Sequence, residues 1–398
     1  MIRTVAWALF DLANTFFAVA MLSFHFPLWV VEDRGARELS LSIALGLSMA
    51  CVAAIMPFAG AVSDAAGRRM QFVRWTTYGC TVATALVGMT SHLGLALLLF
   101  GLANICYQLG TIFYDALLWD VATRDRLGAV SGFGAAFGYL GSILGMVLLG
   151  RFLQAGNHQA AFAPCAGYFL LFALPSFLLI REAEERRPVI WGDVVRSARL
   201  RLAMTIRSAR ALSGLWRYLW ASLFSFSAIN TVLVFMAVYT RKVVGFSEAQ
   251  IIRYFLLTQV CAVAGSLSFG VVIRRLGARR TLLWIWCGWM GALALVAVNP
   301  SVQWLWVAGP MMGFCLGSTW ATSRVLITEL SPKNQLAEMF GLAGLVGRVS
   351  AILGPFLWGV LVWEPSGYRL AILSLVGLLA VGIWLLRGVP PAQEGAIS

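Results

Sequence analysis

The chain has 398 residues, of which 60% are hydrophobic and only 12% are charged. Soluble domains carry about 25% charged residues, so this chain has too few polar side chains to cover a soluble protein of its size. Its net charge of +13 would suit nucleic acid, but the basic residues flank apolar segments, where they contact anionic lipid headgroups. The composition therefore excludes a soluble protein and argues against nucleic acid as a partner.

Twelve segments are long and apolar enough to cross a bilayer, which takes about 20 residues. In the first, Asp11 and Asn14 interrupt the apolar run and no small-residue cleavage site follows, so we expect a retained helix rather than a signal peptide. The predicted spans, in chain order, are 5–31, 41–62, 72–90, 93–119, 128–150, 160–180, 216–239, 249–273, 281–299, 302–328, 338–362 and 368–387.

The distribution of Lys and Arg predicts the orientation of these spans, because cytoplasmic loops are enriched in both residues. With the N-terminus inside, 21 of the 30 basic residues lie in cytoplasmic loops or at the cytoplasmic ends of spans, and 7 lie in the loops or span ends of the opposite side. The remaining 2, Arg324 and Arg348, are assigned to the spans themselves. We therefore expect both termini in the cytoplasm, and we expect the membrane to be the cytoplasmic (inner) membrane of a bacterium.

One long polar stretch, residues 182–215, links spans six and seven. Residues 190–212 mix Arg with apolar side chains such as Leu200 and Met204, a pattern typical of a basic amphipathic helix that lies on a membrane surface. We expect an N-terminal six-helix bundle over 1–181, this cytoplasmic linker, a C-terminal six-helix bundle over 216–388, and a cytoplasmic tail over 389–398.

The two halves share glycines that recur after 209 residues. The tripeptide Ile-Leu-Gly that ends at Gly145 recurs ending at Gly354. The matched pairs are Gly132 and Gly341, Gly138 and Gly347, Gly145 and Gly354, and Gly150 and Gly359. Repetition of half a membrane protein predicts two homologous bundles with a site between them, as in many secondary transporters.

A glycine-rich loop follows the second span and reads Gly60-Ala-Val-Ser-Asp64-Ala-Ala-Gly67-Arg68-Arg69. It resembles the loop motif G-x-x-x-D-x-x-G-R-[RK] of the major facilitator superfamily, at the place where that family has it. Glycines allow a tight turn, and an Asp can interact with the dipole of a neighbouring helix start.

In that family the loop acts as a latch that holds the two halves in one state of the transport cycle. The resemblance implies that Asp64 faces the start of span eleven and that Arg68 or Arg69 pairs with Asp120. A second copy of the motif, from Gly270 to Arg280 in the second half, has Arg274 in place of Asp64, so we do not expect a second, symmetrical latch.

The resemblance extends over most of the chain and sharpens to one branch of the superfamily. The segments that carry it are Trp7-Ala-Leu-Phe-Asp11-Leu-Ala-Asn14-Thr-Phe, Phe113-Tyr114-Asp115-Ala-Leu-Leu, Ser131-Gly132-Phe-Gly134, Gly138-Tyr139-Leu-Gly141 and Gly354-Pro355. They look like the "unknown major facilitator" branch, which is related to fungal vacuolar amino-acid efflux permeases of autophagy. The resemblance implies the twelve-helix major facilitator fold in two pseudo-symmetric bundles, and an amino-acid-like substrate. That branch often has an Asp-Gly pair where this chain reads Ser227-Ala228, so no role of that acid is carried over.

Span four carries a polar stripe of Asn104, Gln108, Thr111 and Asp115, whose spacing puts all four on one helix face. Such a stripe cannot face lipid, so it lines either a water-filled cavity or another helix. The resemblance favours a cavity, because spans one, four, seven and ten line the central cavity of that fold.

Span one carries Asp11, Asn14 and His25, also on one face. Placing an ionisable side chain within a membrane span costs free energy, so such residues are functional candidates by default. For His25, a hydrogen-bonded packing role and a pH-sensing role remain equally open. Asp11 or Asp115 is also a candidate carrier of a coupling proton, because a desolvated carboxylate binds protons more readily.

In the second half, Arg324 of span ten corresponds to Asp115, and Arg348 of span eleven adds a second cation. Acids on one wall and guanidinium groups on the other suit a zwitterion, whose carboxylate an Arg can bind through two hydrogen bonds. Alternatively, Asp115 and Arg324 pair with each other as a cytoplasmic gate. Trp320 could stack on substrate or serve packing.

These patterns predict a secondary active transporter, working as a monomer in the lipid bilayer, that moves a small polar or zwitterionic solute by alternating access. Proton coupling is one option. The chain has no credible catalytic, metal or nucleotide-binding arrangement, so we expect no enzyme activity, no cofactor and no metal. One alternative is a transporter or flippase of amphipathic or lipidic substrates. Another is a non-transporting membrane receptor or scaffold on the same fold.

Overall fold

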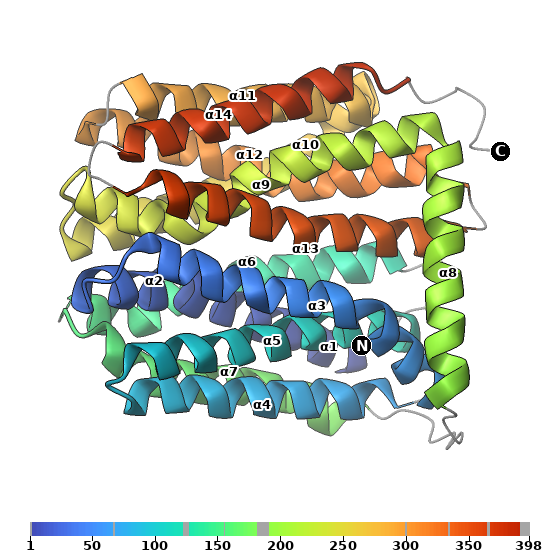
Figure 1. Ribbon diagram of the computed structural model, residues 1–398, viewed down its shortest axis with the longest axis horizontal. Coiled ribbons are helices and arrows are strands. Elements are labelled where there is room, and N and C mark those ends of the chain that lie inside the picture. Colours follow the sequence, from blue (N-terminus) through green and yellow to red (C-terminus); the bar gives the residue numbers. More distant parts are fainter. Residues whose placement is uncertain are drawn as a thin grey trace. The chain divides into compact units, whose positions relative to one another are not determined.

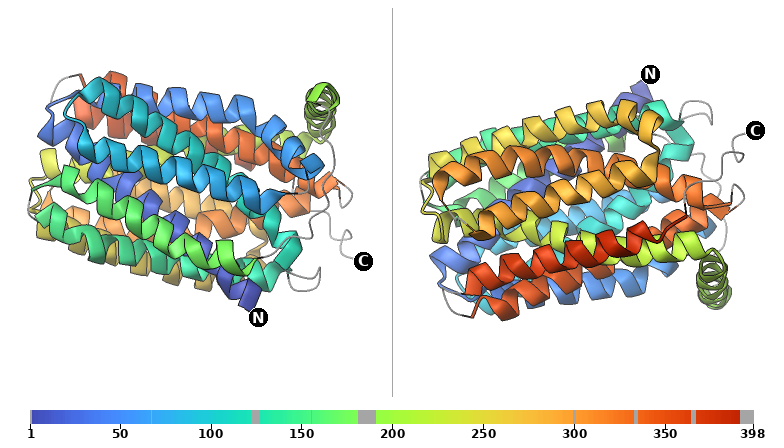
Figure 2. Two further views of the ribbon diagram at one scale, coloured as in Figure 1. Left: turned by 90° about the horizontal axis from the view of Figure 1, so that it is seen from below. Right: turned by 90° about the horizontal axis from the view of Figure 1, so that it is seen from above.

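The computed structural model describes residues 2–66, 68–121, 127–154, 156–180, 191–298, 301–332, 335–363 and 367–390. Over these residues every regular element is helical, which confirms the predicted all-α fold (Figure 1). The chain divides into two compact units, Met1–Leu200 and Arg201–Ser398. Within each unit the long helices run side by side (Figure 2).

The N-terminal unit contains six membrane-length helical segments. Its first segment is a composite of α-helical and π-helical turns, and the other segments are α-helices. In chain order the elements are α1 (Ile2–Phe17), η1 (Ala18–His25), α2 (Phe26–Leu28), η2 (Trp29–Asp33), α3 (Glu38–Ala66), α4 (Arg69–Met89), α5 (Leu93–Val121), α6 (Leu127–Gln154), η4 (His158–Ala161) and α7 (Phe162–Leu179).

The first segment departs from the single α-helix that the sequence predicts. At its π-helical turns, the Phe26 N–H donates to the Met21 carbonyl and the Arg34 N–H to the Trp29 carbonyl, each five residues earlier. Pro27 lies between the two turns, and it has no N–H to donate within the helix. Since π-helical turns are rare and frequently mark functional sites, the second half of this span is a candidate functional segment.

The C-terminal unit repeats the arrangement with α-helices throughout. Its elements are α9 (Ser213–Lys242), α10 (Glu248–Leu276), α11 (Ala278–Val298), α12 (Val302–Leu330), α13 (Leu336–Leu361) and α14 (Gly367–Arg387). A capping box of Ser247 and Gln250 begins α10, and Gly277, with a positive φ of 76°, ends it. Glycine adopts that backbone conformation without the strain that a side chain would bring, which permits the short turn into α11.

Helix packing has the same pattern in both units. In the N-terminal unit α1 packs on α6 and α7, while α5 packs on α3 and α4; in the C-terminal unit α9 packs on α13 and α14, while α12 packs on α10 and α11. One matched pair of glycines serves equivalent contacts, because Gly145 on α6 faces the Phe16 carbonyl of α1 and Gly354 on α13 faces the Ser227 carbonyl of α9. The repeat in the sequence is therefore a repeat of structure, as predicted.

Ten helices of the described part of the chain are long and apolar enough to cross a membrane. The other two predicted spans correspond to α4 and α12, which have 21 and 29 residues. Both are long enough to span, but Thr, Ser, Gly and Arg side chains make them more polar. Each packs with the helices of its unit in the repeated pattern described above.

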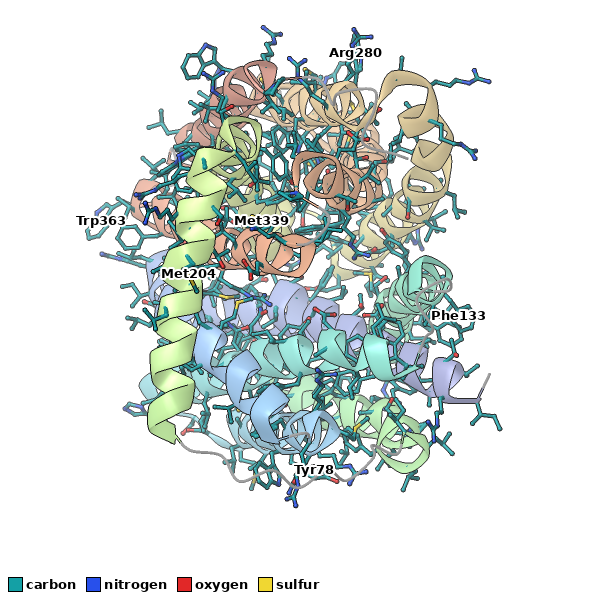
Figure 3. All side chains as sticks on the ribbon, turned by 90° about the vertical axis from the view of Figure 1, so that its right-hand side faces the viewer. Tyr78, Phe133, Met204, Arg280, Met339 and Trp363 are labelled. Atoms are coloured by element: carbon teal, nitrogen blue, oxygen red, sulfur yellow. The ribbon has the colours of Figure 1, made fainter. Side chains whose placement is uncertain are left out.

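Helix α8 (Trp191–Ala211) falls within the predicted linker and contains the boundary between the two units. The Thr205 hydroxyl donates to Glu338 Oε2 at 3.2 Å, which ties α8 to the first turn of α13. On its other side Leu200 and Met204 are 56% and 59% exposed; Figure 3 views this helix with Met204 labelled. Its predicted position on a membrane surface stays a prediction.

Candidate functional site

A reciprocal clasp joins α1 to α5 in the N-terminal unit. The Trp7 indole N–H donates to the Tyr114 carbonyl at 3.3 Å, and the Tyr114 hydroxyl donates to the Trp7 carbonyl at 3.1 Å. The two rings stack with centroids 4.6 Å apart and an interplanar angle of 14°. Both side chains are buried, so the clasp fixes the register of the two helices at this level.

Two predicted site residues, Asp11 and Asp115, lie next to the clasp. Asp11 lies one turn after Trp7 on α1, and Asp115 follows Tyr114 on α5; both carboxylates interact electrostatically with the Tyr114 hydroxyl group. Asp11 is half-buried and Asp115 is exposed. A Cβ on Gly138 of α6 would lie 3.2 Å from Asp11 Oδ2, so this glycine leaves room for the carboxylate.

The polar stripe of span four divides into two parts. Asn104 is fully buried, and its amide donates to the Ser48 hydroxyl of α3 at 2.7 Å. Gln108 donates to the Asn104 side-chain oxygen at 3.5 Å, and Thr111 donates to the Tyr107 carbonyl of its own helix. Asn104 therefore lies in the contact between α3 and α5, whereas Asp115, on the same helix face, is exposed.

The two other predicted residues of span one are buried. Asn14 is 5% exposed and His25 is 4% exposed. Asn14 lies in α1, whereas His25 ends the π-helical segment η1, beyond the Trp7–Tyr114 clasp along the span. His25 therefore belongs to a different part of the unit from the two acids.

In the C-terminal unit, Trp320 and Arg324 lie one turn apart on α12. Trp320 is 39% exposed and stacks on Phe226 of α9, with ring centroids 5.0 Å apart. Arg324 is exposed, and Arg348 on α13 is half-buried. The two acids thus belong to one unit and the two guanidinium groups to the other, so their joint action on one solute stays a prediction.

The predicted latch is described only in part. Gly67 lies outside the described residues, as do the side-chain positions of Asp64 and Asp120; Gly60 lies within α3. Arg68 donates to Gln71 Oε1 at 3.2 Å, and Arg69 donates to the Ala116 carbonyl of α5 at 3.4 Å. Arg69 therefore ties the first turn of α4 to α5, close in sequence to Asp115.

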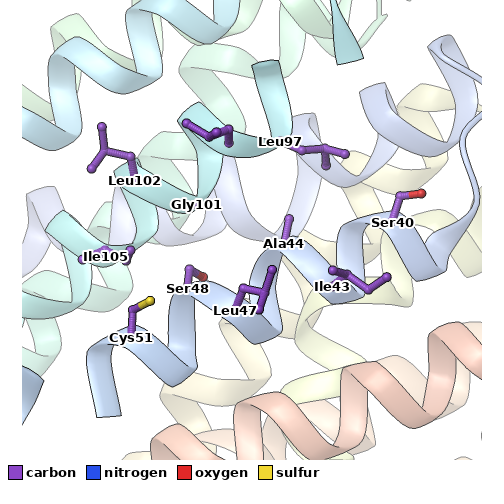
Figure 4. Close-up of a pocket in the computed structure, with 11 residues that line it drawn as sticks. Ser40, Ile43, Ala44, Leu47, Ser48, Cys51, Leu97, Gly101, Leu102 and Ile105 are labelled. Atoms are coloured by element: carbon purple, nitrogen blue, oxygen red, sulfur yellow. The ribbon is translucent and has the colours of Figure 1, made fainter. Parts of the chain in front are cut away.

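An apolar groove of about 460 Å³ runs between α3 and α5 (Figure 4). Its lining comprises Ser40, Ile43, Ala44, Leu47, Ser48, Cys51, Leu97, Leu98, Gly101, Leu102 and Ile105. No carboxylate or cation lines it, and it contains none of the predicted site residues. Its chemistry suits a hydrocarbon chain rather than a zwitterion.

Sequence reasoning missed several contacts that shape these sites. Trp7 and Tyr114 lie in the motifs noted above, but nothing in the sequence signals their reciprocal hydrogen bonds. Asp33 and His158 lie outside the predicted spans, where polar residues draw no attention, yet they bond to each other at 2.7 Å. Among the described residues, neither unit by itself brings three His, Cys, Asp or Glu ligand atoms within 4.8 Å of one another.

The comparisons with known proteins agree with this architecture. A family model described as "Vacuole effluxer Atg22 like" matches residues 40–394. The chain is 24% identical to the uncharacterized MFS-type transporter YxiO of Bacillus subtilis (strain 168), over 99% of this chain and 96% of that protein. It is 22% identical to autophagy-related protein 22 of Kluyveromyces lactis, over 69% of this chain and 60% of that protein.

Among solved structures, that of the nucleoside transporter NupG matches with a TM-score of 0.76 at 12% identity, over 97% of this chain and 99% of that chain. A likeness at this level of identity shows the fold alone. The chain is thus an integral multi-pass membrane transporter of the major facilitator type, and it belongs to the Atg22-like vacuole effluxer family.

Proposed function

We propose that the protein is a secondary active transporter that moves a small polar or zwitterionic solute, such as an amino acid, by alternating access. The observation that carries this proposal is that two acids, Asp11 and Asp115, flank the Trp7–Tyr114 clasp and both interact electrostatically with Tyr114. Carboxylates within membrane helices are costly and mark substrate or ion pathways. An ammonium group is their natural partner.

In this proposal the solute's ammonium group binds Asp11 or Asp115, and its carboxylate binds Arg324 or Arg348 through a bidentate hydrogen-bonded pair. The exposure of Asp115 and Arg324 supports access of a solute to both. The same two residues can also pair with each other as a cytoplasmic gate when the solute has left. Trp320, which is partly exposed, then lines a wall of the site.

The pseudo-symmetric halves supply the moving parts, because rocking of two bundles around a central site is the general mechanism of such folds. The latch at Arg68 and Arg69 biases one state. The family's name refers to efflux from the vacuole. For this chain we propose a bacterial cytoplasmic membrane with both termini inside, on the strength of the Lys and Arg bias, and a monomer as the working form.

The test uses purified protein in liposomes that contain a pH-sensitive dye and are loaded with unlabelled amino acids. Radiolabelled amino acids added outside report counterflow, and the dye reports any accompanying proton movement. We expect Asp115→Asn to lose counterflow of the amino acid that the wild type carries. Glu329→Gln is the matched control, because Glu329 is also an exposed carboxylate on a long helix but lies outside the proposed site. Equal counterflow by wild type and Asp115→Asn would refute the assignment of this acid.

The groove between α3 and α5 favours a second candidate, transport of an amphipathic or lipidic substrate. Its lining is apolar and lies along two membrane-length helices, so an acyl chain fits its chemistry. In that case the same liposomes would show no amino-acid counterflow. A fluorescent phospholipid would then move between leaflets at a rate that Gly101→Leu, which narrows the groove, decreases.

A further inference from the structure

Two of the chain's three histidines meet inside the N-terminal unit. His25 ends η1, His158 begins η4, and their ring centroids lie 6.2 Å apart. They are 4% and 2% exposed. His158 Nδ1 forms a 2.7 Å hydrogen bond with Asp33 Oδ1 at the end of η2. Three ionisable groups from separate elements therefore share one buried place.

The backbone around this cluster is held in position from both sides. On one side, the two π-helical segments end at His25 and Asp33, and such segments are rare and frequently functional. On the other side, Asn157 caps η4 by accepting from the Ala160 N–H. The Gln159 amide donates to the Gly88 and Thr90 carbonyls, which fixes η4 against the end of α4.

Each histidine has one ring nitrogen without a hydrogen-bond partner among the residues that the structure describes. These atoms are His158 Nε2 and His25 Nδ1. A buried polar atom that lacks a partner costs about 1–3 kcal/mol, so proteins rarely keep two of them side by side without a use. The hydrogen bond from Nδ1 to a carboxylate makes Nε2 the nitrogen of His158 that can accept a proton.

Two carboxylates lie close to the His158 ring. Asp33 contacts His158 directly, and Glu32 brings a second carboxylate oxygen within 4.8 Å of a ring nitrogen of His158. The cation Arg34 is directed elsewhere, since it donates to Gln159 Oε1 and stacks on the Trp29 ring. Arg151, in the last turn of α6, lies over the Phe152 ring.

The ends of α4 and α7 that pack on η4 add no acid or base of their own in this unit. Arg69 and Arg74 of α4 belong to its first turns, whereas its last turn packs on η4 through Gly88 and Thr90. The described segment of α7, Phe162–Leu179, holds no Asp, Glu, His, Lys or Arg. Apart from His25, the ionisable neighbours of His158 described above in this unit are thus the carboxylates of Asp33 and Glu32.

We propose that His158, Asp33 and His25 form a buried proton relay and that the coupling proton is held there during transport. His158 Nε2 takes a proton from water, and the resulting imidazolium is neutralised by Asp33. Transfer of that proton to His25 Nδ1 restores the neutral His158 ring and leaves His25 as an imidazolium. His25 then releases the proton on its other ring nitrogen, Nε2, to water, so one proton enters and one proton leaves for each passage. The relay rests on the proposed function, and it leaves Asp11 and Asp115 to bind the solute.

The test separates proton coupling from solute binding. In proteoliposomes, counterflow of radiolabelled amino acids needs no net proton movement, whereas accumulation driven by an imposed pH gradient does. We expect His158→Gln to keep counterflow within about twofold of wild type while its gradient-driven accumulation falls to the level seen without a gradient. Asp33→Asn should weaken the same step. His92→Gln is the matched control, because His92 is the third histidine and is exposed in the loop before α5.

Undiminished gradient-driven accumulation by His158→Gln would overturn the relay. Loss of counterflow as well, in a variant that elutes as wild type does on gel filtration, would also overturn it, because His158 would then belong to the solute site. Absence of counterflow in the wild type would count against the proposed function instead.

A second measurement tests the relay without any substrate. Nuclear magnetic resonance of protein labelled with ¹⁵N at histidine should show a His158 ring signal that changes with pH, disappears in His158→Gln and shifts in Asp33→Asn. A His158 signal that stays constant over the working range of the transport assay would overturn the relay, whichever solute the protein carries.

Discussion

Gly145 and Gly354 are matched by the repeat, yet the structure predicts unequal costs for replacing them with alanine. Alanine is favoured over glycine in a helix interior by about 1 kcal/mol, so helix propensity alone would stabilise both variants by the same amount. At Gly145 the new Cβ would lie 3.2 Å from the Phe16 carbonyl oxygen, a contact that a shift of a few tenths of an ångström relieves. We therefore expect Gly145→Ala to be nearly neutral.

At Gly354 the new Cβ would meet the Ser227 carbonyl oxygen and the Thr231 hydroxyl of α9, both closer than 3.0 Å. The Thr231 hydroxyl already donates to that same carbonyl at 2.7 Å, so neither group can turn aside without losing its partner. Helix α13 must move away from α9, and overpacking of this kind costs about 1–3 kcal/mol. After about 1 kcal/mol of gain in helix propensity is subtracted, Gly354→Ala should be destabilised by up to about 2 kcal/mol relative to wild type.

The assay is thermal unfolding of the purified variants in one detergent, followed by tryptophan fluorescence. Gly347→Ala is the control on the same helix, since a Cβ there would have no atom within 4 Å, and it should melt at or slightly above the wild-type temperature. Gly354→Ala should melt several degrees below both of the other variants. Equal melting temperatures for Gly354→Ala and Gly145→Ala would refute the close approach of α13 to α9.

Three further substitutions test other contacts. Tyr114→Phe removes the 3.1 Å hydrogen bond to the Trp7 carbonyl but keeps the stacked rings. It should lower the free energy of unfolding by about 1 kcal/mol and raise the KM for transport. An unchanged KM would argue that the clasp does not position the acids. Asn104→Ala removes a fully buried amide that bonds to Ser48. It should lower the free energy of unfolding by about 1–3 kcal/mol, which is measured as a lower melting temperature. An unchanged melting temperature would mean that water replaces the amide. Ser247→Ala removes the capping box of α10 and should lower the stability of that helix end by about 1 kcal/mol. The measurement is amide hydrogen exchange, which should become faster only in the first turn of α10. Faster exchange spread evenly over the protein would contradict the local role of the cap.

The sequence was sufficient for the fold because the signals of a membrane fold are local or repetitive. The span predicted over 93–119 is observed as α5, Leu93–Val121, since hydropathy alone decides which residues can lie in a bilayer. The recurrence of Gly145 as Gly354 predicted equivalent helix contacts, and the packing of α1 on α6 and of α9 on α13 has that equivalence.

The same reasoning could not detect the π-helical turns in the first span. A segment that is apolar on nearly every face has no periodicity from which to tell five-residue from four-residue hydrogen bonding. Distant hydrogen bonds were equally invisible, because the pairing of Trp7 with Tyr114 and of Asp33 with His158 depends on how helices from separate parts of the chain are packed.

For the candidate site, the sequence by itself determined which ionisable residues the apolar spans contain, because their cost in a membrane makes Asp11, Asp115 and Arg324 conspicuous. Only the tertiary structure decided their surroundings. It directed Asn104 into the contact with Ser48 and left Asp115 exposed on the same helix face. It also buried His158, a loop residue by sequence, beside Asp33. The physical reason is that composition and hydropathy determine whether a residue can enter the membrane, whereas the partner that it meets there depends on packing between segments far apart in the chain.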